Sequence, residues 1–206
     1  MSNSIIFIGS HDNYRNRPSL KQFYHVNLFA VPPREILFRI FASFVPPLLK
    51  KYRKVYVDFL GPILALVLLT CLLLYGHSLK QFNEHGSPIQ LVLVFSTLMP
   101  ILCFVSLKLG RSTIDIYETV SLVGYSLYGH ILTLLVSFLF YQEHSNIFFW
   151  CLTFFGGSST LRLVLVCFGT IPVPAMRFLI CSTISLANIL FLIYLHYAFM
   201  HQPTVL

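Results

Sequence analysis

The stretch Lys50–Pro62, with the sequence Lys-Lys-Tyr-Arg-Lys-Val-Tyr-Val-Asp-Phe-Leu-Gly-Pro, separates two kinds of chain. Its first five residues hold four cations, and after Asp58 no Asp, Glu, Lys or Arg appears until Lys80. Before this stretch the sequence is mixed and polar, as in chain that lies in water or at a membrane surface. After it the sequence is almost continuously apolar, in runs of about 20 residues that are long enough to cross a bilayer. The stretch therefore marks the start of a membrane domain.

The composition excludes an ordinary soluble domain. Of the 206 residues 56% are hydrophobic and only 10% are charged, whereas about a quarter of residues are charged in soluble domains. The apolar residues form Leu, Phe and Val blocks rather than the alternating pattern of a membrane β-barrel. The first 30 residues do not read as a signal peptide, because they lack its basic start, apolar centre and small-residue cleavage site in that order. The sequence predicts an all-α membrane protein.

Five apolar runs predict five transmembrane helices joined by short connections. We expect them at about residues 59–75, 89–107, 120–141, 147–168 and 177–200. The corresponding organisation is a flexible cytosolic segment (1–33), a surface helix with a basic juxtamembrane segment (34–54), a membrane domain (55–200) and a short lumenal tail (201–206).

A short amphipathic helix is predicted over Arg34–Val45. It follows Pro32-Pro33, and proline is well tolerated at a helix start. Four apolar residues fall at helical spacing, with two arginines elsewhere on the wheel: Leu37, Ile40, Phe41 and Phe44, with Arg34 and Arg39. We expect a helix on the cytosolic bilayer surface; the alternative is a small cytosolic packing element.

The distribution of cations predicts the orientation. Nine of the 14 basic residues precede the first span. With the N-terminus in the cytosol, twelve Lys and Arg residues outside the spans lie on the cytosolic side and only Lys80 lies on the other. An excess of Lys and Arg on the cytosolic side is usual in membrane proteins. The C-terminus then lies on the lumenal or outer side. The membrane-surface cluster consists of Lys50, Lys51, Arg53 and Lys54, which would face anionic headgroups; nucleic acid is not an expected partner.

Span three carries a polar stripe at helical spacing, formed by Ser126, His130, Thr133 and Ser137. Polar residues within spans face other helices or a water-filled path. The structural interpretation is hydrogen bonding between helices, and the functional one is a proton or substrate pathway. We favour the structural interpretation, because no Asp or Glu lies inside a span to complete a relay.

Arg162 is the one charge inside a span. It can clamp span four to Asp115 or Glu118, reach to the surface, or contact an anion or lipid headgroup. The part of span four just before it has unusually small side chains, at Gly156, Gly157, Ser158, Ser159 and Thr160. Small residues let helices approach closely, so spans three and four are expected to form the packed core or a dimer face.

The sequence contains few residue patterns that are typical of metal sites or catalytic sites. The five cysteines lie in apolar runs without metal-ligand spacing, so neither a disulfide framework nor a zinc site is indicated. The paired carboxylates or supported nucleophile that a membrane hydrolase needs are also missing. We expect no catalytic residues, no metal and no cofactor.

Several motifs resemble the Yip-domain (YIPF) family of five-span Golgi membrane proteins. Asp58-Phe-Leu-Gly-Pro62 is similar to that family's opening of span one, and Gly124-Tyr125-Ser-Leu127-Tyr-Gly129-His130 to its signature in span three. The run Gly156-Gly157-Ser-Ser-Thr-Leu-Arg162 and the segment Tyr194–Phe199 resemble the third-member animal branch in particular.

This resemblance implies a non-enzymatic protein of the Golgi or early secretory membranes, which can cycle with the endoplasmic reticulum. It implies association with related five-span proteins, as homo- or hetero-oligomers, and with Rab-type GTPases in vesicle traffic or Golgi organisation. The alternative from the residues themselves is a small transporter or channel-like protein that uses the stripe of span three and Arg162.

Overall fold

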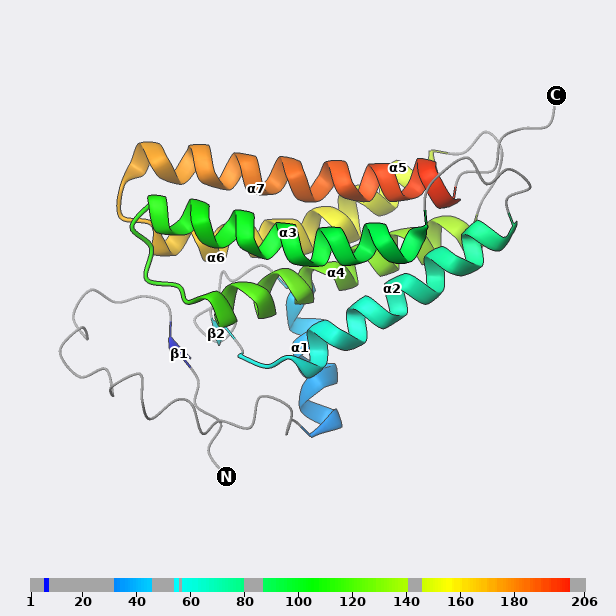
Figure 1. Cartoon of the computed structure of the whole chain (residues 1–206), viewed down its shortest axis with the longest axis horizontal. Coiled ribbons are helices and arrows are strands. Elements are labelled where there is room, and N and C mark those ends of the chain that lie inside the picture. The colour runs from blue at the N-terminus through cyan, green and yellow to red at the C-terminus, as the bar shows by residue number, and fades with distance from the viewer. Residues whose placement is uncertain are drawn as a thin grey trace.

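The computed structural model describes residues 6–7, 32–45, 54–55, 57–79, 87–140 and 146–200. Helices α2 (Leu60–Leu79), α3 (Pro88–Leu109) and α4 (Ile116–Leu139) lead into a composite helix. That helix consists of α5 (Ile147–Cys151), the π-helical turn η4 (Leu152–Gly156) and α6 (Gly157–Thr170). Helix α7 (Pro174–Leu195) then continues into the π-helical turn η5 (His196–Met200). The spans run back and forth along the long axis of the molecule (Figure 1).

Within the described residues, five helices are long and apolar enough to cross a membrane, as the hydropathy predicted: Leu60–Ser78, Pro88–Leu109, Ile116–Leu139, Ile147–Thr170 and Pro174–Met200. Their bounds differ from the apolar runs by a few residues, because local chemistry decides where a helix begins. Helix α4 starts four residues before its apolar run, where the Glu118 side chain accepts a hydrogen bond from the backbone N–H of Asp115 at 3.0 Å. This is half of a capping box. Helix α7 starts at Pro174, in the first helical position.

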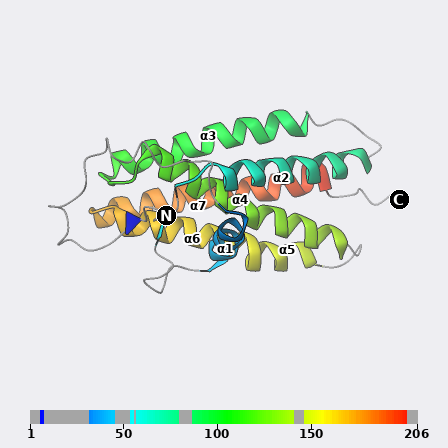
Figure 2. The ribbon, with the colours of Figure 1, turned by 90° about the horizontal axis from the view of Figure 1, so that it is seen from below.

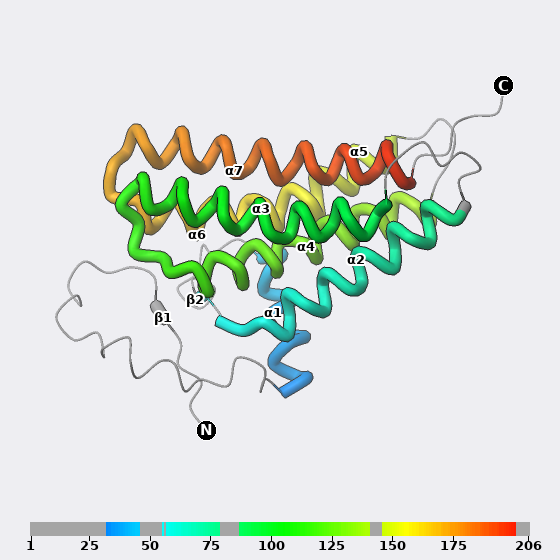
Figure 3. Tube along the Cα trace, in the orientation of Figure 1, coloured from blue at the N-terminus to red at the C-terminus, as the bar shows by residue number. Residues whose placement is uncertain are grey.

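Helix α4 is the centre of the bundle. Two thirds of its most apolar window (67%) is buried inside the protein, against 22% for α3 and 33% for α7. It packs against α2, α3, α5, α6 and α1, and the tube view shows it threading between its neighbours (Figure 3). Its polar residues can therefore be met by protein rather than by lipid.

Two apolar clusters fill the two halves of the bundle. One joins α2, α4 and the end of α7, around Leu69, Leu134 and Leu195. The other joins α3, α4, α6 and the start of α7 and includes three buried cysteines: Cys103, Cys167 and Cys181. All five cysteines are free thiols.

Helix α1 (Pro33–Phe44) lies across the bundle rather than along it. It is seen nearly end-on when the molecule is viewed from below (Figure 2). The helix forms where the sequence predicts it, and the side that it turns toward the bundle includes only part of the apolar side of the wheel, with Ile40 and Phe44 packed against the core. Its buried residues are Ile36, Arg39, Ala42 and Ser43, whereas Leu37 and Phe41 are exposed. A contact made by Arg39, described below, explains this orientation.

One further contact was not predicted. The two-residue strands β1 (Ile6–Phe7) and β2 (Lys54–Val55) pair in antiparallel register, with Ile6 opposite Val55. The chain just before the first span is thereby joined to a segment near the N-terminus. Residues 1–5 and 8–31 of the predicted N-terminal segment, three of the four clustered cations (Lys50, Lys51 and Arg53) and the tail at 201–206 lie outside the described residues.

Candidate functional site

The most concentrated polar arrangement in the described residues is centred on Asp58, whose surface is fully buried. Its carboxylate accepts hydrogen bonds from Arg39 Nη1 at 2.5 Å and from the Tyr125 hydroxyl at 2.9 Å. Its other oxygen accepts one from the backbone N–H of Gly61 at 3.0 Å. A buried charge is tolerated only when it is paired and hydrogen-bonded, and here three donors meet that need. One carboxylate thus joins α1, α2 and α4.

Local structure places each of these partners. Asp58 stands just before α2 and three residues before Gly61, so its carboxylate reaches one of the backbone N–H groups left unpaired in the first turn. Arg39 projects from the middle of α1 and also pairs with Glu35, one helical turn earlier, at 3.0 Å. Tyr125 projects from α4 across the start of α2.

Glycine allows α2 and α4 to approach closely at this point. A Cβ atom added to Gly61 would overlap the Tyr125 hydroxyl, and one added to Gly124 would overlap the ring of Pro62. The backbone oxygen of Gly61 accepts a hydrogen bond from the Tyr128 hydroxyl at 2.9 Å. The motif that opens span one is therefore interlocked with the motif of span three.

A similar contact joins α4 to the composite helix. A Cβ on Gly129 would overlap Ser159 and would lie 2.8 Å from the backbone oxygen of Phe155. The Thr133 hydroxyl donates to the Gly129 oxygen at 2.7 Å and lies 3.3 Å from the Cys151 oxygen. These contacts place Ser159 of span four directly against Gly129 of span three.

The polar stripe of span three faces inward, and all four of its side chains are buried. His130 bridges α4 and α7. Its Nδ1 lies 3.2 Å from the backbone oxygen of Ser126, and its Nε2 lies 3.2 Å from the backbone oxygen of Asn188. The Asn188 side chain in turn donates to the Thr160 hydroxyl on α6 at 2.7 Å. Next to the imidazole, Phe95 and Phe191 stack with centroids 3.5 Å apart.

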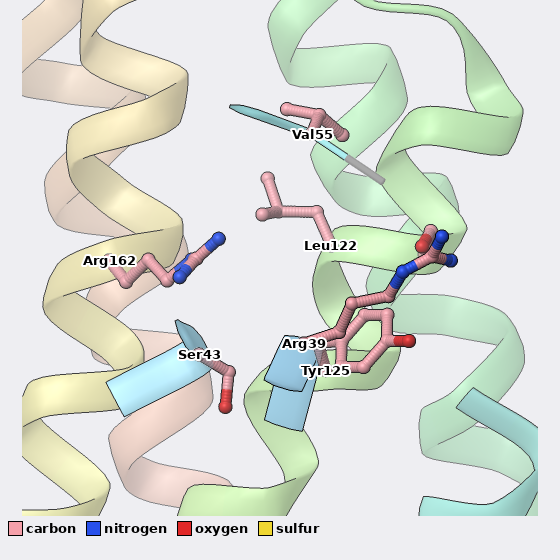
Figure 4. A pocket seen from close by; sticks show the side chains of 7 residues that line it. Arg39, Ser43, Val55, Leu122, Tyr125 and Arg162 are labelled. Carbon is pink, nitrogen blue, oxygen red and sulfur yellow. The ribbon is translucent and has the colours of Figure 1, made fainter. Parts of the chain in front are cut away.

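A small cavity lies between α1, α4 and α6, beside the Asp58 junction. It comprises about 250 Å³ of space outside the protein atoms, part of it continuous with the surroundings. Arg162 reaches toward it from α6, opposite the side chains of α1 and α4 (Figure 4). The lining residues are Arg39, Ser43, Val55, Ser121, Leu122, Tyr125 and Arg162.

The charge of Arg39 is held in place by its neighbours. Burial by itself lowers the pKa of this guanidinium, but the hydrogen bond and negative charge of Asp58 outweigh that effect, so the pKa is raised. Arg39 is therefore a permanent cation, and the Arg39–Asp58 pair is a fixed electrostatic joint between α1 and the bundle.

The structure places the sequence-derived candidates in different surroundings. It brings Asp58, Gly61, Pro62, Gly124 and Tyr125 into one junction, and Leu127 lies in the apolar core. In the small run of span four, Ser159 and Thr160 are buried and Gly156 faces Leu192. Gly157 and Ser158 are only partly buried, and a Cβ on Gly157 would meet nothing closer than the Leu152 oxygen at 3.6 Å.

Two residues of these networks escaped the sequence reasoning. Arg39 was assigned to the polar side of a surface helix, although a lone carboxylate at the start of a span demands a cation. Asn188 was not singled out, although a polar amide within an apolar run indicates a helix contact. Both signals were present, but neither names a partner far away in the sequence.

Comparison with known proteins identifies the family. The family model described as the YIPF3 C-terminal domain matches residues 33–200, from the start of α1 to the end of η5. No solved structure matches the chain. The match covers α1, every helix of the bundle and the Asp58 junction, so the chain belongs to the YIPF3 C-terminal domain family, as its motifs suggested.

Proposed function

We propose that this chain is a non-enzymatic scaffold of the Golgi and early secretory membranes. It acts in vesicle traffic or Golgi organisation by associating with related five-span proteins and, through its cytosolic side, with trafficking factors such as Rab-type GTPases. The cytosolic N-terminus and lumenal C-terminus inferred from the cation distribution are part of this proposal.

The observation that carries the proposal is the interlocking of the family motifs. Asp58, Gly61 and Pro62 engage Gly124 and Tyr125 by hydrogen bonding and close contact. Buried polar groups used in this way specify one arrangement of helices. Family-typical residues that build a rigid helical body are what a scaffold requires, because its outer surfaces must hold a constant shape for partners.

The polar stripe supports this assignment over a transport path. His130 and Thr133 contact backbone oxygens of neighbouring helices, and Ser126 donates to the Val123 oxygen of its own helix at 2.7 Å. Groups committed to such contacts are not free to carry a solute or a proton through the bundle without rearrangement.

Affinity capture of the full chain from gently solubilised membranes tests the proposal. We expect a second five-span protein of the same family to be recovered at near-stoichiometric amounts, and an unrelated multi-span Golgi protein with the same tag serves as control. Repeated recovery of the chain alone, or of the same proteins by the control, would contradict the scaffold assignment.

A pair of variants separates scaffold from transporter. His130→Ala and Arg162→Ala should leave ion and solute flux across reconstituted membranes unchanged from protein-free vesicles, as should the unaltered chain. A flux that the unaltered chain supports and His130→Ala abolishes, while partner capture persists, would replace the scaffold proposal with the transporter.

A further inference from the structure

We propose that two turns at one end of the bundle form a docking surface for the headgroups of anionic phospholipids. These turns join α3 to α4 and α6 to α7, and they lie at the same end of the molecule (Figure 1). Lys108 and Arg111, on the first turn, are the cations that contact the lipid. This surface would exist whether or not the chain acts as a scaffold, since it requires only the membrane spans.

Direct contacts make the two turns one continuous surface. The Ser112 hydroxyl donates a hydrogen bond to the Thr170 hydroxyl at 2.8 Å. A Cβ atom on Gly110 would lie 3.2 Å from Cγ2 of Ile171, so a larger residue at this position would hold the turns apart. The Arg177 guanidinium donates to the backbone oxygen of Ile171, and it thereby adds a third cation to the same surface.

The two cations of the α3–α4 turn have no acidic partner in the part of the chain that the structure describes. Lys108 and Arg111 are both exposed, and no ion pair of the described residues involves either of them. The Lys108 ammonium rests 5.3 Å from the centroid of the Phe104 ring. Two acidic residues follow in the sequence, but both serve the start of α4. Asp115 is its N-cap, and Glu118 is only 6% exposed and accepts a hydrogen bond from the Asp115 N–H. The charges of Lys108 and Arg111 therefore remain available to a ligand.

The backbone of Arg111 shows that the fold does not require an arginine here. Its φ angle is 57°, in the left-handed region that a Cβ atom disfavours. The Ser112 N–H donates to the Leu107 oxygen at 2.9 Å, as in the Schellman motif, where glycine usually takes the left-handed position. The glycine of this turn, Gly110, stands one residue earlier and has a φ angle of −74°. An exposed arginine in a conformation better suited to glycine points to a contact outside the chain.

The surroundings of these cations favour a lipid over an acidic peptide. Lys108 lies in the last turn of α3 and Arg177 in the first turn of α7, so both stand where a candidate span ends. Beside them Leu109 is 71% exposed and Phe178 is 69% exposed. The phosphate oxygens of a headgroup suit the N–H groups of a guanidinium, and the exposed apolar side chains suit acyl chains. An acidic peptide would match the cations but would leave these apolar side chains exposed to water.

Photo-cross-linking of the purified full chain in phosphatidylcholine nanodiscs tests this surface. The probe is a phosphatidylserine with a photoreactive diazirine in its acyl chain, and the cross-linked peptides are located by mass spectrometry. We expect the probe to label the peptides that hold the two turns, and unlabelled phosphatidylserine to displace it. Equal labelling by a phosphatidylcholine probe would overturn the proposal. Displacement by soluble polyglutamate but not by phosphatidylserine would also overturn it, in favour of an acidic protein partner.

Variants of Arg111 separate lipid binding from stability. Each cation near an anionic bilayer surface contributes about 1 kcal/mol, so Arg111→Gly should reduce labelling of the turns roughly fivefold, whereas Arg111→Lys should retain it. Because glycine suits the left-handed position, Arg111→Gly should unfold at no lower a temperature than the unaltered chain. Lys80→Gln, which removes a cation from the connection between α2 and α3, is the matched control and should be labelled normally. Unchanged labelling of Arg111→Gly, or a lower unfolding temperature of that variant, would overturn the assignment of Arg111 as a lipid contact.

Discussion

Asp58 places a full negative charge inside the protein, and its three donors come from three different helices. Removing the carboxylate by Asp58→Ala would leave Arg39 buried without its countercharge. Breaking a buried pair on one side costs about 3–5 kcal/mol. We expect a loss of stability of that size, measured by thermal or denaturant unfolding of the purified chain in detergent.

The control for this prediction is the joint replacement of the pair. When both partners become apolar residues of similar volume, no charge remains uncompensated, and stability is often largely recovered. The double variant Arg39→Met/Asp58→Leu should therefore be clearly more stable than the sum of its single changes predicts. Strict additivity of the two single effects would show that the pair is not energetically coupled.

Gly124 and Gly157 form a natural comparison, because both lie within helices but differ in what surrounds them. A methyl group at Gly124 overlaps Pro62, whereas one at Gly157 reaches only ordinary contact distance. Gly124→Ala should destabilise the chain by about 1–3 kcal/mol through overpacking. Gly157→Ala should be neutral or stabilising by up to about 1 kcal/mol, since alanine is the better helix former. Equal unfolding midpoints for the two variants would contradict the close α2–α4 contact.

The sequence revealed the residues of the junction better than it revealed their partners. Asp58, Gly61, Gly124 and Tyr125 could be selected as motif residues, because they match motifs of the family that the sequence resembles. The hydrogen bonds of Asp58 with Tyr125 and of Gly61 with Tyr128 each join positions 67 residues apart, and one sequence holds no direct record of such pairing. Arg39 was missed for the same reason.

Helix α1 shows how one polar contact can decide which side of a helix faces the protein. Its periodicity predicted the helix, with an apolar side that includes Leu37 and Phe41 on the bilayer surface. In the structure Arg39 must reach Asp58, so the side with Arg39 and Ala42 faces the bundle. Phe41 remains 72% exposed. In a bilayer this surface is available to lipid, which is consistent with the proposed membrane-surface helix but on the side away from the protein.

Substitution at adjacent positions of α1 tests this orientation. Ala42→Phe should displace the helix, because Ala42 is buried against the bundle. Phe41→Ala should leave it docked. Hydrogen exchange over residues 33–44, read by mass spectrometry, should accelerate at least tenfold in Ala42→Phe and remain unchanged in Phe41→Ala. The reverse result would contradict the docking of α1 through the side that carries Ala42.

At the scale of the whole molecule, hydropathy was sufficient for the number of spans but not for their arrangement. Apolar length depends on composition, so five runs gave five helices. Which helix becomes central depends on specific contacts. Helix α4 takes that place because its glycines admit α2 and the composite helix, and because Asp58, Asn188 and the backbone of neighbouring helices meet its polar groups. The glycines and the polar stripe predicted close packing of spans three and four, but they did not predict that α4 would also contact α1 and α2.

The orientation of the whole bundle leads to the final prediction. Each basic residue near an anionic bilayer surface contributes about 1 kcal/mol, and the cations nearest the first span stand at Lys50, Lys51, Arg53 and Lys54. Replacing all four with Gln should produce a mixture of orientations, read by protease protection of a C-terminal tag in sealed microsomes. Lys80→Gln, which removes the one lysine or arginine that the proposed topology assigns to the opposite side, should leave the orientation uniform. If the fourfold variant also inserts uniformly, Lys108 and Arg111 between α3 and α4 must set the orientation, and their replacement should then scramble it.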